Sequence, residues 1–506
     1  MCCRIMLKYF LFTITILIGY NSALAQPMNI RVSADSVDVY QPQEVSIAID
    51  PHNPLRLAIG SNGNWIFTSS DAGNTWLTAR FHPRFGGGGD PSLVFDNSGY
   101  LYYASLQYSS IGIMRSSDGG ITFDTGVHVG IDTTVQDKPT LIIDHGGSGT
   151  IALGWTRFAH YPSQKYSDSS HIMVSLAHDN GLNWLPAVRV DDVGGDCLDS
   201  SNTAEGAVPA FGSKGEMYIV WSARDSIFFH SSMDGGLTFG QDHTIAFQPN
   251  GWTIFEKEVE RANGFPTICS DQSSGVFSGN LYVVWTDTRT GVPDAYFIRS
   301  TDHGETWSSP YNLTLQDTSH HLFPAMTVDP TTGHIFIAYY SINKSKKDST
   351  DVFLATSIDG GVTFKTIKVS KFAFVANNFL GDYMSIIAFN RHIYPVWVRN
   401  ESTVRTSIWT ALVQDTVSSS LVDQSLSASP VIHIIGGVVP VVILSLPESG
   451  NVNIQIFDNV GRACSSIQKN FSSGEQHIEL GPSFSHGVYL ARIFILAKIY
   501  LVKFVL

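Results

Sequence analysis

The chain has 506 residues, of which 43% are hydrophobic and only 15% are charged. This composition supplies enough apolar side chains for large cores and excludes a disordered protein. The formal net charge of −13 and the lack of a basic stripe argue against nucleic acid as a partner.

Residues 1–25 are expected to be a secretory signal peptide. Arg4 and Lys8 precede the short apolar run YFLFTITILIGY, and ALA before Gln26 is a small-residue cleavage site. The apolar run is too short for a membrane-spanning helix. We therefore expect a secreted mature chain that begins near Gln26.

A phrase of eight residues recurs six times in the part of the chain that follows. Its first copy is SSDAGNTW at 69–76, and a clear later copy is SSDGGITF at 116–123. An aspartate can accept backbone N–H bonds across a tight turn, and the glycine two residues later suits a positive φ. We interpret the six aspartates as structural turn residues between a third and a fourth strand: Asp71, Asp118, Asp179, Asp234, Asp302 and Asp359.

The phrase sits inside a longer repeat, whose pattern predicts the four-stranded blade of a β-propeller. From residue 91 to 116, three apolar, alternating stretches are separated by turn residues, and the phrase follows them. A seventh module, at 382–413, lacks the phrase and a fourth strand. Residues 28–37 could supply that strand and close the ring. The prediction is an all-β propeller of seven blades over residues 26–413, and six blades is the alternative.

The recurring S-x-D-x-G-x-T-W phrase resembles the Asp-box, or bacterial neuraminidase repeat, of sialidases. The resemblance covers about residues 40–413 and implies a sialidase-like β-propeller. Asp-boxes also occur in receptors, other hydrolases and assembly factors, so the resemblance says little about activity.

A second unit is expected after a Ser-rich linker at 414–430. Short strands with turn signals predict a small Ig-like β-sandwich over 431–506. Its opening, 431–446, is apolar but interrupted by glycine and proline, and it is too short for a membrane helix. We interpret this opening as one or two buried strands.

The C-terminal unit resembles the sorting domain of the type IX secretion system of Bacteroidota-like bacteria. The matching stretches are LPESGNVNIQIFDNVGR (446–462), SGEQHIEL (473–480), GVYLARI (487–493) and the terminal KFVL, although the usual Asn-Pro opening is missing. The resemblance implies the type IX secretion machinery as a partner. It also implies a location outside the cell or on the outer-membrane surface of a Gram-negative bacterium.

Propeller geometry predicts where a binding site would lie. The loops before the first strands and after the second strands lie on the face opposite the Asp-box turns. Acidic residues near the axis and arginines further out suit an anionic or hydroxyl-rich ligand, although such groups also tie blades together. The candidate ligand-binding residues are Asp90, Asp137, Glu205, Arg224, Arg261, Arg289 and Asp382. We expect Asp90, Asp137, Glu205, Arg261 and Asp382 to converge at one mouth of the central channel.

Three functions are compatible with this pattern. The first is a non-catalytic protein that binds glycan or protein at the mouth, and it is preferred. The second is a glycoside hydrolase or lyase with an acid and a base among the carboxylates. The third is a sialidase, which the resemblance implies would need three arginines around one spot and an R-I-P phrase. The chain has no such phrase, because RANGFP separates Arg261 from its proline, and this argues against exo-sialidase activity.

Two further expectations concern metals and cysteines. The sequence has no Gly-rich phosphate loop and no Cys/His set with zinc-like spacing, so no cofactor and no metal are expected. The mature chain keeps Cys197, Cys269 and Cys464, too few for a disulfide scaffold. A bridge between Cys197 and Cys269 and a pair of buried free thiols remain as alternatives.

Overall fold

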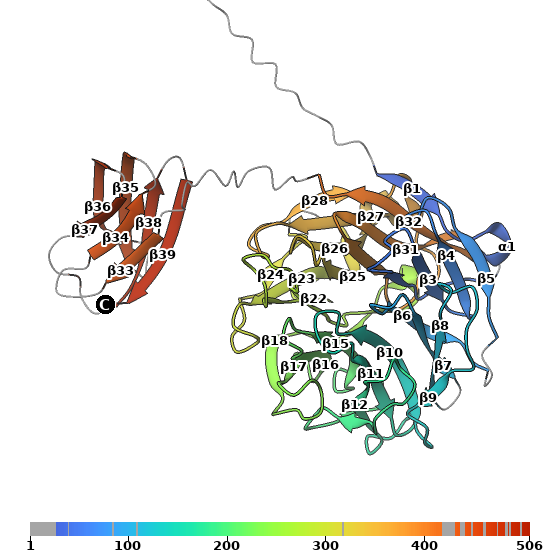
Figure 1. Cartoon of the computed structure of the whole chain (residues 1–506). Helices are drawn as coiled ribbons and strands as arrows, with labels where there is room; N and C mark the ends of the chain where they lie inside the picture. Colours follow the sequence, from blue (N-terminus) through green and yellow to red (C-terminus); the bar gives the residue numbers. More distant parts are fainter. Residues whose placement is uncertain are drawn as a thin grey trace, which may run out of the picture. The chain divides into compact units, whose positions relative to one another are not determined.

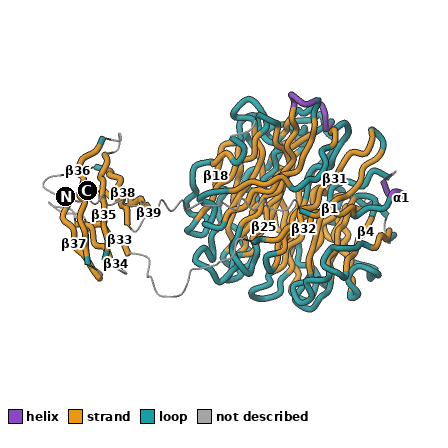
Figure 2. Tube along the Cα trace, turned by 90° about the horizontal axis from the view of Figure 1, so that it is seen from above, coloured by secondary structure: helices purple, strands orange, loops and turns teal. Residues whose placement is uncertain are grey.

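The computed structural model describes the chain in two parts. The first part is 27–416 except 39, 83–85, 108–109 and 316–317; the second is 431–505 except 436–440, 447–448, 459–461, 473, 481–483, 485–486 and 496–497. The predicted signal peptide and residues 417–430 of the predicted linker lie outside the described residues. The chain divides into two compact units, Met1–Asp415 and Thr416–Leu506 (Figure 1). Strands and loops make up nearly all of both units (Figure 2).

The first unit is a β-propeller built from seven antiparallel sheets among the described residues, five of four strands and two in which a short fifth strand joins the four. The first three sheets are β2 (Ser46–Ile49), β3 (Leu57–Ser61), β4 (Trp65–Ser69) and β5 (Leu77–Arg80); β6 (Gly89–Phe95), β7 (Leu101–Gln107), β8 (Ser110–Ser116) and β9 (Val127–Val129); β10 (Val135–Ile143), β11 (Ile151–Phe158), β12 (Ser169–Ala177) and β13 (Val188–Arg189). The next two are β15 (Glu205–Phe211), β16 (Met217–Ala223), β17 (Ser226–Ser232) and β18 (His243–Phe247); β21 (Thr267–Ser270), β22 (Leu281–Asp287), β23 (Asp294–Ser300) and β24 (Tyr311–Asn312). The last two are β25 (His320–Val328), β26 (Ile335–Asn343), β27 (Ser349–Ser357) and β28 (Lys365–Lys368); β30 (Ser385–Phe389), β31 (His392–Ser402), β32 (Arg405–Gln414) and β1 (Met28–Arg31).

Short elements decorate the blades. Strand β14 (Gly195–Asp196) pairs with β12, and β29 (Phe374–Val375) pairs with β27. A small hairpin of β19 (Thr253–Ile254) and β20 (Ala262–Asn263) precedes the fifth blade. The helical elements are α1 (Asp35–Asp38) and the 3₁₀ turns Lys257–Val259 and Lys344–Lys346.

The ring closes through its innermost strands and through the N-terminus. Each first strand contacts the first strand of the next blade, and β30 of the last blade contacts β2 of the first. Strand β1 is the outermost strand of the last blade, where Met28 pairs with Leu412 and Arg31 with Trp409. Of residues 28–37, which were expected to supply this strand, only 28–31 do so, and α1 begins at Asp35; the pairing removes a free sheet edge from the ring.

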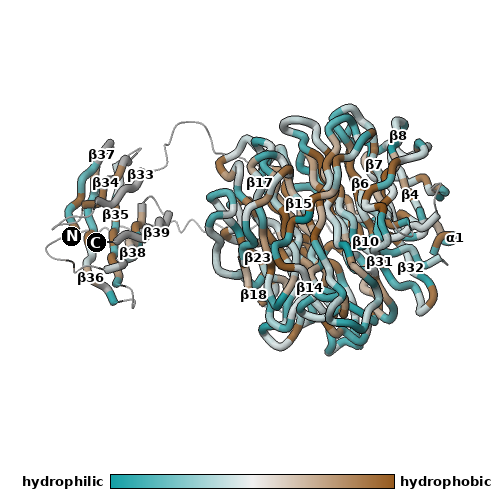
Figure 3. Tube along the Cα trace, turned by 90° about the horizontal axis from the view of Figure 1, so that it is seen from below, coloured by the Kyte–Doolittle hydropathy of each residue, from teal (hydrophilic) through white to brown (hydrophobic). Residues whose placement is uncertain are grey.

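The cores lie between neighbouring blades. A tryptophan of the second strand is fully buried in three consecutive blades, as Trp155, Trp221 and Trp285. The second strands are hydrophobic on both faces because each blade packs on two neighbours. Hydrophobic residues accordingly follow the strands and hydrophilic ones gather at the loops (Figure 3).

The six recurrent aspartates bind the turn in which they stand. In the second blade, Ser116 donates to Asp118 Oδ1 at 2.7 Å, and Thr122 donates its backbone N–H and hydroxyl to the same carboxylate at 2.9 and 2.6 Å. The Gly120 N–H donates to Ser116 Oγ, and Gly120 has a φ of 97° that favours glycine. The other copies repeat the contact to the residue four positions on, with Asn183 in place of threonine at Asp179.

We predict that Asp118→Ala lowers the free energy of unfolding by about 1–2 kcal/mol, because several turn hydrogen bonds are lost. The affinity of the protein for a ligand at the opposite face should not change. Denaturant unfolding and binding measured on the same preparation check this expectation. A large loss of binding with unchanged unfolding would contradict a purely structural role.

The second unit is a small β-sandwich. One sheet has the order β33 (Val431–Ile435), β34 (Val441–Leu446) and β37 (Gly474–Glu479); the other has β36 (Ala463–Phe471), β35 (Gly450–Asp458), β38 (Val488–Ile495) and β39 (Lys498–Val505). Buried side chains from both sheets form one core, including Val442, Leu444, Ile454 and Ile493. The apolar opening of this unit thus forms two strands.

Two further observations bear on expectations from the sequence. Cys197 and Cys269 are both free thiols, and Cys269 donates to the Met326 carbonyl at 3.3 Å, so the bridged alternative is not the one found. Burial raises the pKa of the Cys269 thiol to about 12. No helix of the described residues is long and apolar enough to cross a membrane.

Candidate functional site

The starts of the innermost strands bring seven ionisable side chains together at one end of the ring. Asp90 lies on β6, Asp137 and Lys138 lie on β10, and Glu205 begins β15. Glu44 precedes β2, Arg261 precedes β20 and Asp382 precedes β30. We call this set the mouth cluster: Glu44, Asp90, Asp137, Lys138, Glu205, Arg261 and Asp382.

Local backbone irregularities aim several of these side chains. The pairing of the first and second strands shifts register between Gly89 and Ser92, between Asp137 and Thr140, and between Glu205 and Val208. Asp90 and Lys138 have φ values of 50°, each directly before a proline. A bulge of this kind bends a strand and redirects a side chain, and bulges are common beside functional sites.

Lys138 is the centre of the cluster. Its Nζ lies 2.6 Å from Asp382 Oδ2, 3.9 Å from Asp90 Oδ2 and from Glu205 Oε1, and 4.0 Å from Asp137 Oδ2. Burial alone would lower the pKa of Lys138, but the surrounding carboxylates raise that pKa well above its usual value. One buried cation therefore faces four carboxyl groups.

Asp382 is the acid most firmly held in the charged form. The Arg261 guanidinium donates from Nε to Oδ1 at 3.0 Å and from Nη2 to Oδ2 at 2.7 Å, in a bidentate pair. Although burial opposes ionisation, Lys138 and Arg261 together lower the pKa of Asp382. Arg261 also lies over the Phe379 ring, and its side chain remains 58% exposed. It is therefore the cation of the cluster that a ligand can reach.

Three other acids of the cluster favour the protonated form. Burial, followed by the charge of Glu44, raises the pKa of Asp90 to about 8. Burial raises the pKa of Asp137 to about 7, and that of Glu205 well above its usual value, against the opposing effect of Lys138. A neutral carboxylic acid can donate a hydrogen bond or a proton, so these groups are chemically versatile near neutral pH.

A cavity of about 190 Å³ opens beside the cluster. It is lined by Asp137, Glu205 and Arg261 on the polar side, and its aromatic lining consists of Tyr161, Trp252, Phe255 and Phe265. Phe255 is 87% exposed, and Tyr161 donates to Asp199 Oδ2 at 2.7 Å. A second cavity of about 210 Å³ in the channel shares Lys138 and Asp382 with the first. The mouth thus joins hydrogen-bonding groups to an aromatic wall.

The structure brings together Asp90, Asp137, Glu205, Arg261 and Asp382, but not the two remaining candidates. Arg224 donates to the Val193 carbonyl at 2.7 Å and lies over Phe228. Arg289 pairs with Asp287 and donates to the Phe247 carbonyl at 2.7 Å. Both arginines were expected further out than the acids, and in the structure each binds its own or a neighbouring blade, so their part in ligand binding stays a prediction. Arg261 is the one arginine of the mouth cluster, whereas a sialidase would need three arginines around one spot.

Two amides contribute to the mouth although nothing in the sequence indicated them there. Lys138 was expected at the mouth beside Asp137 but was not among the candidate ligand-binding residues. Asn62 holds Glu44 and accepts the Asp90 N–H at 2.8 Å, and Asn263 donates to the Asp382 carbonyl at 2.8 Å. No periodic signal distinguished these two amides from ordinary loop residues.

Comparisons with known proteins concern the fold alone. No model of a known protein family matches the chain, and no curated protein sequence is similar to it. An ulvan lyase of polysaccharide lyase family PL25 is 13% identical over 77% of this chain and 96% of its own, with a TM-score of 0.50. A Dyadobacter fermentans protein of unknown function is 13% identical over 77% and 98%, with a TM-score of 0.48. Trypanosoma rangeli sialidase is 11% identical over 85% of each chain, with a TM-score of 0.37. At these identities the likeness is one of fold alone, and it says nothing of the activity of this chain.

Proposed function

We propose that this protein is a glycan-binding β-propeller that acts outside the cell, and that the glycan binds at the mouth cluster and its adjoining 190 Å³ cavity. One observation carries the proposal: acids, the amide of Asn263 and the exposed Arg261 line the same cavity as an aromatic wall. A sugar presents hydroxyl groups and an apolar ring face. A mainly apolar cleft with a few placed polar groups is suited to such a ligand.

Arg261 is the residue whose loss tests this proposal most directly. Arg261→Ala in the mature chain should weaken glycan binding at least tenfold, because the exposed guanidinium is removed from the cavity. The ligand is first found on a glycan array, and affinity is then measured by calorimetry. Arg224→Ala is the matched control, since this arginine lies outside the cluster. Equal binding by both variants and the wild type would refute the assignment of the site.

Hydrolysis or elimination of a glycan is the second candidate function. The observation that favours it is the raised pKa of Asp90 and Asp137, because a protonated acid at neutral pH can serve as a general acid. Against it, Asp382 is held by Lys138 and Arg261. Incubating each bound glycan with the protein and analysing its chain length separates the two functions. Cleavage that is lost in Asp137→Asn but kept in Asp118→Asn would establish the enzyme.

We further propose that residues 431–506 direct export as a type IX sorting domain. Support comes from the resemblance of this segment and from its separate β-sandwich. Deletion of residues 430–506 should leave the protein in the periplasm, whereas the intact chain should reach the surface or the medium. Cell fractionation with an antibody to the propeller measures this. Normal surface delivery of the truncated chain would overturn the proposal.

A further inference from the structure

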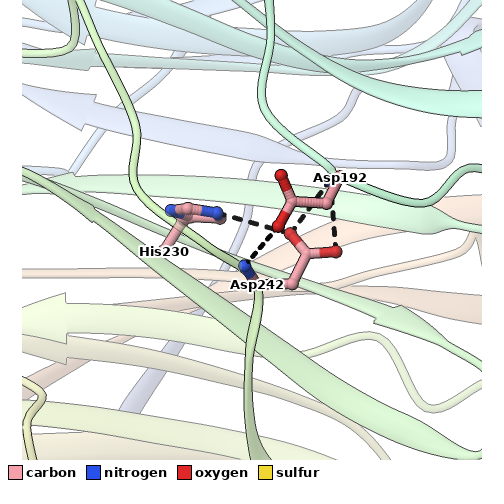
Figure 4. A group of neighbouring side chains, drawn as sticks. All are labelled: Asp192, His230 and Asp242. Atoms are coloured by element: carbon pink, nitrogen blue, oxygen red, sulfur yellow. Dashed lines mark hydrogen bonds and ion pairs between the residues drawn. The ribbon is translucent and has the colours of Figure 1, made fainter.

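A group of three side chains lies at the seam between the third and fourth blades, away from the mouth cluster. His230 stands on β17, Asp242 directly precedes β18, and Asp192 follows β13 of the preceding blade. One ligand atom from each residue lies within 4.8 Å of the other two. Figure 4 shows the imidazole directed at the two carboxylates, which come from separate loops.

The histidine carries the argument. Its side chain is 1% exposed, and among the described residues its Nε2 has no hydrogen-bond partner. Nε2 lies 3.4 Å from Asp242 Oδ1, longer than an ordinary N–H···O bond. Two atoms that each lie about 2.0–2.1 Å from one tetrahedral ion are about 3.4 Å apart, so the spacing suits two ligands of one metal.

The carboxylates are oriented by the backbone. The Asp242 N–H donates to Asp192 Oδ2 at 2.8 Å, and the Asp192 N–H donates to both oxygens of Asp242 at 3.2 Å. Each carboxylate oxygen has two lone pairs, so one hydrogen bond leaves capacity for a metal. Such outer contacts are what fixes ligands in metal sites. Arg224 Nη2 lies 3.9 Å from Asp242 Oδ2, and Arg189 Nη2 donates to the Asp192 carbonyl at 3.0 Å.

We propose that Asp192, His230 and Asp242 bind a zinc ion that joins the third and fourth blades. Zinc is the choice because imidazole nitrogen with carboxylate oxygen suits it, whereas calcium and magnesium prefer all-oxygen sites. Asp192 is exposed, which leaves water free to complete the coordination. No metal was expected from the sequence, because the three ligands lie on two blades and form no local motif.

Zinc binding by the mature full-length chain tests the proposal. Equilibrium dialysis against zinc with an excess of magnesium and calcium should leave about one zinc ion per chain. Asp192→Asn should weaken that binding at least tenfold. This change is on an exposed side chain and keeps an oxygen that can accept the Asp242 N–H. His243→Gln, an exposed histidine one position from Asp242, is the matched control and should bind zinc like the wild type.

Two further measurements distinguish zinc at the proposed site from zinc bound at other positions on the chain. Cobalt in place of zinc should give the visible absorption of a tetrahedral site in the wild type and not in Asp192→Asn. Zinc should also raise the melting temperature of the wild type, and this rise should disappear in Asp192→Asn. Equal zinc binding by both proteins, or none by the wild type, would overturn the proposal. A His230→Asn variant that folds should fail to bind zinc as well.

Discussion

Lys138→Met is expected to lower the free energy of unfolding by about 3–5 kcal/mol at neutral pH, since it removes one partner of a buried ionic group. The ammonium lies within 4.0 Å of oxygens from Asp90, Asp137, Glu205 and Asp382, and its side chain is only 12% exposed. Methionine fills a similar volume but leaves these carboxyl groups to face one another. Urea unfolding followed by circular dichroism measures the loss.

The loss in Lys138→Met should depend on pH in a defined direction. Protonation relieves the repulsion among the remaining carboxylates, so the difference from the wild type should be smaller at pH 5 than at pH 8. Lys365→Met, on the exposed strand β28, is the control and should lie within about 0.5 kcal/mol of the wild type. A Lys138→Met protein as stable as this control at pH 8 would show that the cluster does not depend on its central cation.

The architecture could be predicted well from the sequence because the same sequence pattern recurs in each blade of the propeller. Each module carries the same strand pattern and most carry the same turn, so an error in one module is corrected by the others. The last module lacked a fourth strand, and residues 28–37 were named as a stretch that could supply it. Residues 28–31 of that stretch form β1, which pairs with β32.

The site was predicted only in part, for a physical reason. Position along a first strand places a residue at the mouth, which is why Asp90, Asp137, Glu205 and Asp382 were found. The direction in which a long side chain points depends on its hydrogen-bonding partners in the folded protein, and these cannot be read from the sequence. Arg224 and Arg289 donate to carbonyl oxygens of the preceding blade, at Val193 and Phe247, and lie outside the mouth cluster.

The ligands of the proposed zinc site could not be found for a related reason. Asp192 and His230 are far apart in sequence, and the seam between two blades brings them together. A short motif can reveal ligands on one helix or one loop. Ligands that meet across a seam need the packing of the blades, which becomes visible only in three dimensions.

Asp90→Asn is expected to make the protein less sensitive to alkaline pH, with an effect on the order of a few kcal/mol between pH 4 and pH 8. The folded-state pKa of Asp90 is raised from 3.8 to about 8, chiefly by burial and by the charge of Glu44. Folding therefore takes up a proton in this range. The stabilisation from protonated Asp90 is complete below the unfolded pKa and is lost as the pH rises through about 8. Asparagine mimics the protonated acid at every pH.

The pH dependence of the stability difference between variant and wild type distinguishes a buried neutral acid from an acid in an ordinary ion pair. An acid whose pKa is lowered, such as Asp118, stabilises the fold above pH 4, so the difference between Asp118→Asn and the wild type should stay constant from pH 5 to pH 8. The difference between Asp90→Asn and the wild type should instead shift steadily towards the variant across the same range, as measured by urea unfolding. A constant difference for Asp90→Asn would mean that Asp90 is ionised in the folded protein. The mouth cluster would then carry one more negative charge. A cationic ligand would suit the mouth cluster at least as well as an uncharged, hydroxyl-rich glycan.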